Sequence, residues 1–255
     1  MTRDKRFTPL VSFDIARLGC ANQDRFQLPS DRVDTYVTTI VPRRLHLIWI
    51  GSTLPDWYRA NVESYVAQNP TYEITLWIDM PCAPVAGATA RLVADFPMRH
   101  RAIYQNAPNV GLKADILRYE VIYALGGVYT DIDSRCLRPF DETLQHPFVV
   151  AHEPQHGCLT NAIFGFPERS PFLRFVLDCL PDNYAKYTWV PARTGPHFFT
   201  ACVLSYAVLA QRMRVFDYQV FMPTADDNAD AAFTVHTHDS NWDLVPRSYA
   251  NWERI

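Results

Sequence analysis

The sequence lacks the patterns that mark several large protein classes. No apolar run approaches the roughly 20 residues that a membrane-spanning helix needs. The opening residues, MTRDKRFTPL, are polar and charged, so we expect no signal peptide. A formal net charge of -3 provides no global basic field, which argues against a nucleic-acid partner. No internal repeat or low-complexity tract is present, so an ordinary globular protein is expected.

The cysteines also lack the spacing of a metal site. They are Cys20, Cys82, Cys136, Cys158, Cys179 and Cys202. No two of them form a C-x-x-C pair, which argues against zinc bound by a thiolate pair. Scattered thiols of this kind predict reduced, mostly buried cysteines and a cytoplasmic location.

The hydrophobic runs that are present predict an α/β fold. RLHLIWIG over 44–51 has the pattern of a buried strand, and YEITLWID over 72–79 has that of a second one. Between them, Asp56 is predicted to cap a helix that runs to about Gln68. The strand-helix-strand order favours a parallel sheet. The 255 residues suffice for one large domain over 41–255, with residues 1–40 as an extension packed on it.

A second amphipathic pattern follows further along the chain. GLKADILRYEVIYALGG over 111–127 predicts a helix ended by its two glycines, with an apolar stripe at Leu112, Ile116, Tyr119 and Tyr123. VYTDID over 128–133 predicts the next strand. Further strands are expected over 148–153, 161–166 and 233–242 (the last with a tail), and further helices over 170–180 and 195–213.

Two acids close the strand over 128–133. In an extended segment Asp131 and Asp133 point the same way, about 6 to 7 Å apart. Two such carboxylates repel each other and lose hydration, and a divalent cation would compensate both costs. Hard oxygen ligands suit Mg²⁺ or Mn²⁺, and α/β sheets bind ligands at the carboxyl ends of their strands. The alternative is a solvated turn.

The preceding helix carries a second charged pair. Asp115 and Arg118 are three residues apart and share one face, away from the apolar stripe. They form either a local ion pair worth ~0.5 kcal/mol or one border of a pocket. Because the helix leads through a Gly-Gly turn into the acid-ended strand, we predict the pocket. Arg118 would neutralise a phosphate or orient an acid there, and Asp115 would accept sugar hydroxyls.

Four sequence blocks together resemble a known enzyme family. They are LHLIWIG with the following LP, KADILRYEVIYALGGVYTDID, TGP at 194–196, and HTHDSNW. They are similar to glycosyltransferases whose sugar-binding region contains a DXD motif, such as initiating mannosyltransferases and capsular sugar transferases. The clostridial glucosylating toxins are similar more distantly. The resemblance covers roughly residues 43–242.

The resemblance implies a fold, an activity and cofactors. The fold would be GT-A, a mixed, mainly parallel central sheet flanked by helices. The activity would be transfer of a sugar from a UDP- or GDP-sugar to an acceptor hydroxyl, with retention of anomeric configuration and a Mn²⁺ or Mg²⁺ ion. The acceptor would be a glycan, a lipid-linked or a small-molecule compound, in glycan or polysaccharide synthesis.

The same resemblance assigns roles to the charged residues. Asp133 would ligate the metal directly. Asp131 would reach the metal through water, or hold the donor ribose and sugar. Asp115 and Arg118 would grip the donor sugar.

It also assigns roles to four other residues near the predicted pocket. Trp49 would stack on the nucleotide base, or be a core aromatic. Gly51 would let the backbone pass close to the nucleotide. Tyr129 would line the pocket, or belong to the core. Asn161 would reach the transferred sugar or the acceptor, or be a capping or turn residue.

The tail adds candidates for the metal shell and the diphosphate. His236 and His238 alternate around one residue, so both face one side of a strand and either can complete the metal shell. Ser240 and Trp242 have the Ser-x-Trp spacing that closes over the diphosphate in the family. The toxin-like pattern has a glutamate three residues before this serine, where the present chain has Thr237.

Two other functions fit parts of the sequence. VYTDIDSR also resembles an aspartate-nucleophile phosphatase, in which Asp131 would attack phosphate and Asp133 would act as acid and base. Lys186 and the acid cluster over 226–230 would supply the remaining parts. That motif normally opens its domain, whereas here about 130 residues precede it. A non-catalytic module that binds a sugar nucleotide is the third reading.

Overall fold

The fold is described from a computed structural model, which places residues 7–9, 40–151, 157–206, 213–223 and 231–236. The strands are β1 (Phe7–Pro9), β2 (Arg44–Trp49), β3 (Glu73–Ile78), β4 (Thr89–Leu92), β5 (Gly127–Thr130), β6 (Ser134–Cys136), β7 (Phe148–Ala151), β8 (Leu159–Phe166), β9 (Arg214–Phe216) and β10 (Thr234–His236). The helices are α1 (Asp56–Gln68), α2 (Arg101–Asn106), α3 (Val110–Leu125), α4 (Pro171–Lys186), α5 (Val190–Arg193) and α6 (Pro196–Ser205), with short 3₁₀ turns at Val93–Asp95, Asp141–Thr143 and Tyr218–Val220.

The main sheet is mixed. Its strand order is β1-β9-β7-β8-β5-β2-β3-β4, and β10 and β6 form a separate two-stranded sheet. The pairings among β5, β2, β3 and β4 are parallel, as is β7 with β9. Strand β8 runs antiparallel to both of its neighbours, and β1 runs antiparallel to β9. The predicted α/β class is therefore confirmed, including the β2-α1-β3 unit.

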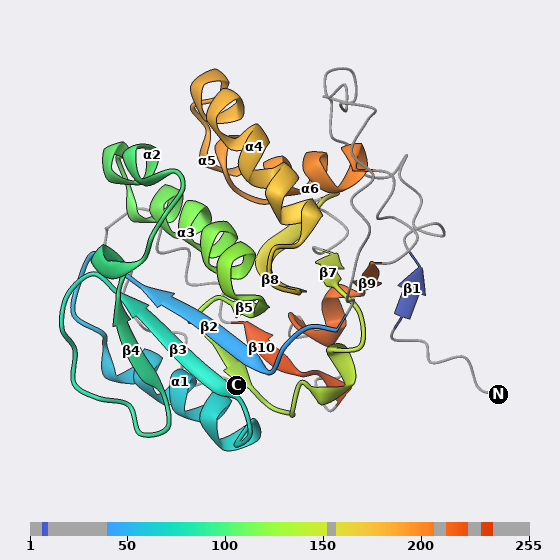
Figure 1. Ribbon diagram of the computed structural model, residues 1–255. Coiled ribbons are helices and arrows are strands. Elements are labelled where there is room, and N and C mark those ends of the chain that lie inside the picture. Colours follow the sequence, from blue (N-terminus) through green and yellow to red (C-terminus); the bar gives the residue numbers. More distant parts are fainter. Residues whose placement is uncertain (1–6, 10–39, 152–156, 207–212, 224–230, 237–255) are drawn as a thin grey trace.

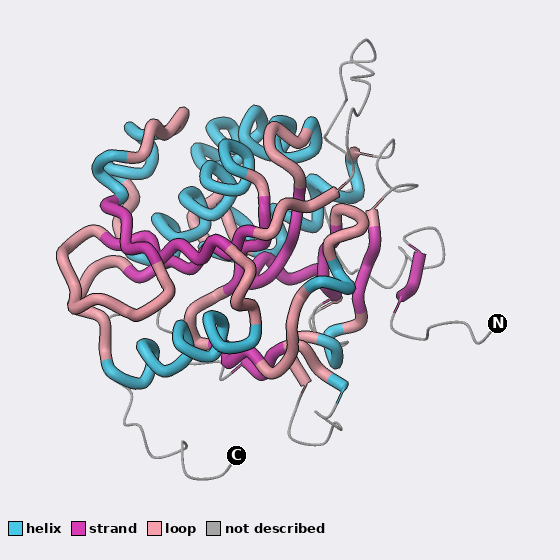
Figure 2. Tube along the Cα trace, turned by 60° about the horizontal axis from the view of Figure 1, so that its bottom comes forward, coloured by secondary structure: helices cyan, strands magenta, loops and turns pink. Residues whose placement is uncertain are grey.

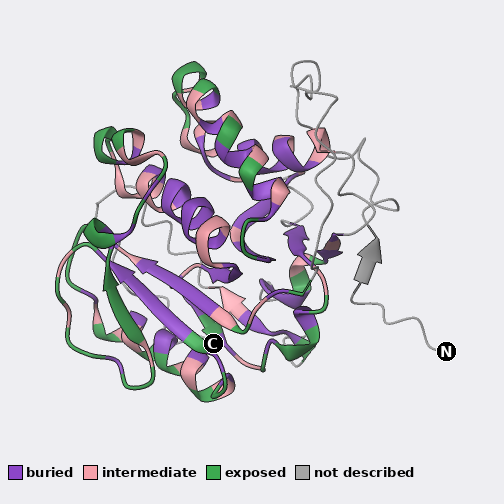
Figure 3. Ribbon diagram, in the orientation of Figure 1, coloured by how far each residue is buried: buried purple, intermediate pink, exposed green. Residues whose placement is uncertain are grey.

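Helices cover both faces of the sheet. Helices α3, α4 and α6 lie on one face, and α1 and the β6–β10 sheet lie on the other (Figures 1 and 2). Side chains alternate along β2: Leu45 and Leu47 belong to the cluster under α1, and Ile48 belongs to the cluster under α3. The central strands and most of α3 are buried (Figure 3). Such burial on both faces explains why these strands read as continuous apolar runs.

A tight turn fixes α3 against β5. Gly126 ends the helix with a φ of 64°, and Gly127 follows with a φ of 106°. A Cβ atom on Gly127 would lie 2.6 Å from the backbone oxygen of Arg44. Only glycine fits this close approach. The turn therefore places the Asp131–Asp133 segment beside the face of α3 that carries Asp115.

Two local predictions were wrong. Asp56 is the first helical residue of α1 rather than its cap. Pro55 holds the cap position, and no side chain caps the helix. Strand β4 was not predicted within 81–108, because all four of its residues are exposed and show no apolar alternation. It is the edge strand of the sheet, where pairing needs no buried side chains.

Other predictions concern the chain ends, the cysteines and membrane spans. Of the predicted extension over 1–40, the described residues are β1 and Ile40, so its packing stays a prediction. The five described cysteines form no disulfide, and Cys136, Cys158 and Cys202 are buried. Among the described helices, none is both long and apolar enough to span a membrane.

A buried histidine makes the stability of the fold depend on pH. His46 Nε2 donates to Gly126 O at 3.0 Å, and its Nδ1 accepts from the Trp77 indole at 3.3 Å. Burial lowers the pKa of His46 from 6.5 to about 4. The unfolded chain therefore binds a proton that the folded chain excludes, so stability is full above pH 6.5 and is lost as pH falls toward 4.

We expect protonation of His46 to lower the unfolding free energy by about 3 kcal/mol as pH falls from 6.5 to about 4. Urea unfolding at several pH values measures it, with the His46→Gln variant as reference. The variant should be less stable at neutral pH but show a flatter pH dependence. Parallel pH profiles for both proteins would contradict the assignment.

Candidate active site

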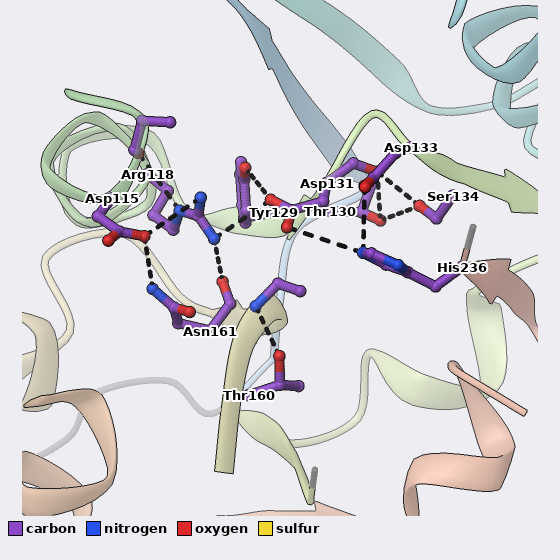
Figure 4. A network of polar contacts seen from close by, with 12 residues as sticks. Asp115, Arg118, Tyr129, Thr130, Asp131, Asp133, Ser134, Thr160, Asn161 and His236 are labelled. Carbon is purple, nitrogen blue, oxygen red and sulfur yellow. Dashed lines mark hydrogen bonds and ion pairs between the residues drawn. The ribbon is translucent and has the colours of Figure 1, made fainter. Parts of the chain in front are cut away.

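One cavity of about 470 Å³ collects most of the predicted site residues. It opens at the carboxyl ends of β2 and β5, beside α3, and the start of β8, the α5–α6 corner and β10 complete its wall. Figure 4 shows the polar side chains at its centre. The predicted site residues that line the cavity are Trp49, Asp115, Arg118, Tyr129, Asp131, Asp133, Asn161 and His236.

The two acids lie in a turn rather than in a strand. Strand β5 ends at Thr130, and Ile132 and Asp133 form a turn before β6 begins at Ser134. The predicted extension of the strand through Asp133 was therefore wrong. The turn still directs both carboxylates into the cavity (Figure 4).

His236 joins the two carboxylates from a distant part of the chain. Strand β10 pairs with β6, and His236 lies opposite Ser134 in that pairing. Its Nε2 atom lies 3.1 Å from Asp133 Oδ1 and 3.9 Å from Asp131 Oδ2. One ligand atom from each of the three residues falls within 4.8 Å of the others. Two carboxylates suit either Mn²⁺ or Mg²⁺, and the added imidazole favours the transition metal, Mn²⁺.

The electrostatics of this cluster favour a cation. Burial opposes a charge on His236, but Asp133 and Asp131 outweigh it and raise its pKa to about 10. The cluster thus attracts positive charge strongly enough to hold a proton on a partly buried imidazole. A metal ion would displace that proton, because imidazole binds metals in its neutral form. The residues present therefore fit the ion that the resemblance implies.

Asp115 and Arg118 form an internal network rather than an exposed helix face. Both are buried, at 5% and 6% exposure, although they were predicted to lie away from the apolar stripe. Arg118 Nη2 lies 3.3 Å from Asp115 Oδ1, and its Nη1 lies 3.2 Å from Asp131 Oδ1. The guanidinium also stacks on the Tyr129 ring, 4.5 Å from the centroid. Arg118 thus joins the helix to the acid turn.

The charge of Arg118 is secured by its neighbours. Burial opposes the cation, but Asp131, Tyr129 and Asp115 outweigh this effect and raise the pKa of Arg118. The Arg118 Nη1 atom also donates to the backbone oxygen of Asn161 at 2.7 Å. Because its donors face two acids and a carbonyl, the geometry favours the predicted role of orienting acids over that of neutralising phosphate.

Both oxygens of Asp115 are occupied by protein donors. Asn161 Nδ2 donates to Oδ1 at 2.8 Å, and Thr194 Oγ1 donates to Oδ2 at 2.7 Å. The Tyr119 hydroxyl accepts from Asn161 at 3.0 Å and donates to Thr194 O at 2.8 Å. Burial raises the pKa of Asp115, although Arg118 and these hydrogen bonds oppose the shift. Asn161 lies within β8, so it is neither a cap nor a turn residue.

Two network residues were missed in the sequence. Tyr119 was assigned to the apolar stripe of its helix, and its ring is indeed buried, but its hydroxyl belongs to the site. Thr194 stands in the TGP block, which was noted for resemblance alone. Its neighbour Gly195 is required, since an added Cβ atom would lie 3.4 Å from Asp115 Oδ2 and 2.9 Å from the Pro191 backbone.

Trp49 and Tyr129 both pack within the fold and line the cavity, and stacking of Trp49 on a base stays a prediction. The Trp49 ring lines the cavity, packs 4.7 Å from the Tyr58 ring and donates to Ser52 O at 3.0 Å. Tyr129 is 2% exposed, yet its hydroxyl donates to Asp131 Oδ1 and its ring lines the cavity. Both residues are therefore anchored in the fold with one side on the site.

Gly51 lies outside the residues that line the cavity. It has a φ of 91°, and an added Cβ atom would lie 2.6 Å from Val110 Cγ1. Its N–H donates to Asp79 Oδ2 at 2.8 Å. Gly51 therefore shapes the turn after β2 and lets it pass close to Val110, which itself lines the cavity.

The remaining candidates lie elsewhere. Thr237, His238, Ser240, Trp242 and the acid cluster over 226–230 fall outside the described residues. Lys186 is exposed at the end of α4, with its ammonium 4.9 Å from the Tyr187 ring, and it does not line the cavity. The phosphatase interpretation therefore loses the lysine it required at the site.

Side chains of helix α1 hold the turn that carries Asp131 and Asp133. Asn61 Nδ2 donates to Ile132 O at 2.9 Å. The Tyr65 hydroxyl hydrogen-bonds with Ser134 Oγ at 2.6 Å and with Thr130 Oγ1 at 2.9 Å. Both α1 side chains are buried. These contacts fix both ends of the turn that carries the carboxylates.

Tyr65→Phe is expected to lower the unfolding free energy by about 1 to 2 kcal/mol, because it removes two buried hydrogen bonds. It should also weaken Mn²⁺ binding, because Tyr65 holds Thr130 and Ser134 on either side of the turn that carries two of the ligands. Urea unfolding and paramagnetic Mn²⁺ titration measure the two effects. Tyr72→Phe is the control, because it also removes a tyrosine hydroxyl. That hydroxyl bonds to Asp141 at 3.4 Å, outside the turn that carries Asp131 and Asp133. Unchanged Mn²⁺ affinity in Tyr65→Phe would exclude this role of Tyr65.

Comparison with known proteins places this geometry in context. Residues 55–150 match the family described as "Glycosyltransferase sugar-binding region containing DXD motif". The chain is similar to inositol phosphoceramide mannosyltransferase 3 of Schizosaccharomyces pombe, with 26% identity over 206 residues, 79% of this chain and 56% of that relative. Three curated relatives are matched over 56%, 26% and 42% of their own length, so the chain spans only part of them.

Solved structures confirm the fold. The PaToxG glycosyltransferase superposes with a TM-score of 0.57 at 17% identity, covering 68% of this chain and 72% of that one. The UDP-bound glycosyltransferase domain of the YGT toxin gives a TM-score of 0.56 at 12% identity, covering 70% of this chain and 80% of that one. The predicted GT-A fold and the predicted resemblance to the DXD family are therefore confirmed.

Proposed function

We propose that this protein is a metal-dependent glycosyltransferase. The premise is that residues 55–150 belong to the family of glycosyltransferase sugar-binding regions that contain a DXD motif. The protein moves a sugar from a nucleoside-diphosphate sugar to an acceptor hydroxyl, with retention of anomeric configuration. The observation that carries the proposal is one cavity in which Asp131, Asp133 and His236 converge beside the Asp115–Arg118 network.

The cation site is assigned to Asp131, Asp133 and His236. A bound Mn²⁺ or Mg²⁺ ion supplies positive charge where the departing diphosphate gathers negative charge. Arg118 and the Tyr129 hydroxyl hold Asp131 Oδ1, which leaves Oδ2 facing His236. The Tyr65 and Asn61 contacts keep the turn in that position. The protein residues are thus preorganised for the ion, and little reorganisation is needed when it binds.

The donor occupies the rest of the cavity. Trp49 offers an aromatic face to the base. Asp115 Oδ2 accepts from Thr194 and has a second lone pair for a sugar hydroxyl, and Asn161 lies beside it. We propose a hexose donor, and mannose is tested first because the S. pombe relative is named a mannosyltransferase. UDP and GDP are both candidates for the nucleotide, and the YGT toxin structure is described as UDP-bound.

Retention is proposed by front-face transfer. A double displacement needs a carboxylate free to attack the anomeric carbon. The carboxylates among the described residues of the cavity wall are Asp115, Asp131 and Asp133. Both oxygens of Asp115 accept protein hydrogen bonds, and Asp131 and Asp133 are assigned to the ion. The acceptor would then attack from the leaving-group side, and a diphosphate oxygen would take its proton.

The acceptor is proposed to be a glycan, a lipid-linked compound or a small molecule that carries a free hydroxyl. The S. pombe relative is named for inositol phosphoceramide, which carries such hydroxyls on its headgroup. A role in glycan or polysaccharide synthesis follows from these acceptors. The five described cysteines are reduced, which fits the cytoplasmic location proposed from their spacing.

The test is donor hydrolysis by the purified chain. UDP- and GDP-hexoses are incubated with Mn²⁺, with Mg²⁺ or with a chelator, and release of nucleoside diphosphate is followed. We expect cation-dependent release from one donor. NMR of the released or transferred sugar then reads the anomeric configuration, and an inverted transfer product would defeat retention. No release from any donor under any condition would defeat the proposed activity.

A further inference from the structure

We propose that Trp189 and His197 form an acceptor subsite that holds a polyhydroxylated ring, either a hexose or an inositol. This proposal rests on the proposed function and names the part of the cavity that receives the sugar. Trp189 precedes α5 and His197 lies in the first turn of α6, and both line the cavity.

Trp189 is exposed in a way that its residue type rarely is. The exposed large hydrophobic side chains among the described residues are Ile40, Leu92 and Trp189, with Trp189 at 60%. Of the three, Trp189 is the one that lines the cavity. An exposed tryptophan at a pocket rim is typical of a ligand contact, because burial of its large surface then accompanies binding.

The corner that carries the indole is held firmly from behind. Asn183 Nδ2 donates to Ala192 O and to Arg193 O, both at 2.8 Å. The Arg193 guanidinium stacks 3.6 Å from the Tyr184 ring centroid and donates from Nε to Tyr184 O at 2.9 Å. A ligand that stacks on Trp189 therefore meets a preorganised surface and does not have to order a loop.

The α5–α6 corner also contacts Asp115, the carboxylate assigned to the donor sugar. Thr194 follows α5 and donates to Asp115 Oδ2, the oxygen that Asn161 and Arg118 leave open. The Tyr119 hydroxyl donates to the backbone oxygen of Thr194. The Trp189 platform is thus built on the residues assigned to the donor sugar, and its outer side faces solvent. A second substrate that enters from solvent meets this platform next to the sugar to be transferred.

The two rings together indicate the chemistry of the ligand. Trp189 and His197 have centroids 5.0 Å apart and planes tilted by 52°. The indole offers a flat apolar face, and the imidazole offers polar nitrogens at its edge. A pyranose or inositol ring presents axial C–H groups on one face and hydroxyls around its rim, so it satisfies both. A lipid tail would form no hydrogen bond with the imidazole, and the side of the tail that faces away from Trp189 would stay exposed to water.

The experiment compares acceptors and variants at saturating donor. Methyl α-mannoside, methyl α-glucoside, methyl α-galactoside, myo-inositol and myo-inositol 1-phosphate are offered with the donor found by hydrolysis, and products are quantified by mass spectrometry. We expect transfer to at least one ring compound. In Trp189→Ala its KM should rise at least roughly tenfold with a smaller change in kcat, as for loss of a tryptophan contact. Trp189→Phe should restore most of the affinity.

Leu92→Ala is the matched control, since Leu92 is also an exposed apolar side chain but lies on the edge strand β4. Its acceptor KM should equal that of the wild type. Preference for a methyl hexoside would assign a glycan acceptor, and preference for the inositols would assign a headgroup. An acceptor KM in Trp189→Ala equal to that of the wild type would overturn the subsite. Donor hydrolysis without transfer to any ring compound would also overturn it while leaving the proposed activity intact. If the wild type showed neither donor hydrolysis nor sugar transfer, the proposed activity itself would be wrong.

Discussion

Replacement of Asp133 by asparagine is expected to lower metal-dependent donor hydrolysis by roughly 10³-fold, because an ion that stabilises the leaving group contributes several kcal/mol to the reaction. Asparagine keeps the shape of the side chain but removes its negative charge. Asp133 Oδ1 lies 3.1 Å from His236 Nε2 in the wild type, so the change removes the nearer acid of the pair. Mn²⁺ affinity, measured by paramagnetic titration, should fall with the activity.

A matched control separates loss of the metal from loss of the fold. Asp79 also follows a parallel strand, but it is exposed. Its carboxylate accepts a hydrogen bond from the Gly51 N–H and lies outside the cation cluster. Asp79→Asn should leave the Mn²⁺ affinity and the chelator sensitivity of hydrolysis as in the wild type. Full activity in Asp133→Asn, or an equal loss in both variants, would contradict the assignment of the cation site.

Replacement of Arg118 by methionine is expected to lower the unfolding free energy by about 3 to 5 kcal/mol at neutral pH, the usual effect of breaking a buried ion pair. Asp115 and Arg118 are 5% and 6% exposed, so Asp115 loses its counter-charge without gaining water. Urea unfolding at several pH values measures the change. Donor hydrolysis should be lost as well, because Asp131 is no longer held toward the cluster.

The pH dependence of this variant identifies the cause. Burial already raises the pKa of Asp115 above 3.8, and loss of Arg118 removes the largest effect that opposes this shift. A folded-state pKa above the unfolded value means that stability is lost as pH rises through that interval and regained as pH falls. The deficit of Arg118→Met should therefore shrink in acid. The double variant Asp115→Asn with Arg118→Met should recover part of the stability at neutral pH, and purely additive losses would contradict the pairing.

Local sequence patterns predicted the parts of the fold that are locally determined. The runs over 44–51 and 72–79 became β2 and β3, and the helix between them begins at Asp56 and ends at Gln68. The apolar stripe and the glycine pair predicted α3 and its end. These elements are read well because burial imposes a period on the sequence. Strand β4 shows the reverse case, since its residues are exposed and impose no period.

The charged centre of the candidate site was predicted best where its residues are close in the sequence. Asp115, Arg118, Asp131 and Asp133 lie on consecutive elements, and the structure brings them to one cavity. His236 was one of two alternatives, and its position depends on the pairing of β10 with β6, which no local pattern reveals. The contacts of Thr194, Tyr65 and Asn61 also join elements that are distant in the chain. Trp189 has no sequence signal at all, because exposure is a property of the folded surface.

The most direct measurement of the central claim is a calorimetric titration of the wild-type chain with UDP and with GDP, in Mn²⁺ and in chelator. The claim is that one cavity binds a nucleoside diphosphate through a cation held by Asp131, Asp133 and His236. We expect one of the two nucleotides to bind in Mn²⁺ and its binding to be lost in chelator. Binding of neither nucleotide, or binding of equal strength with and without the cation, would contradict the claim.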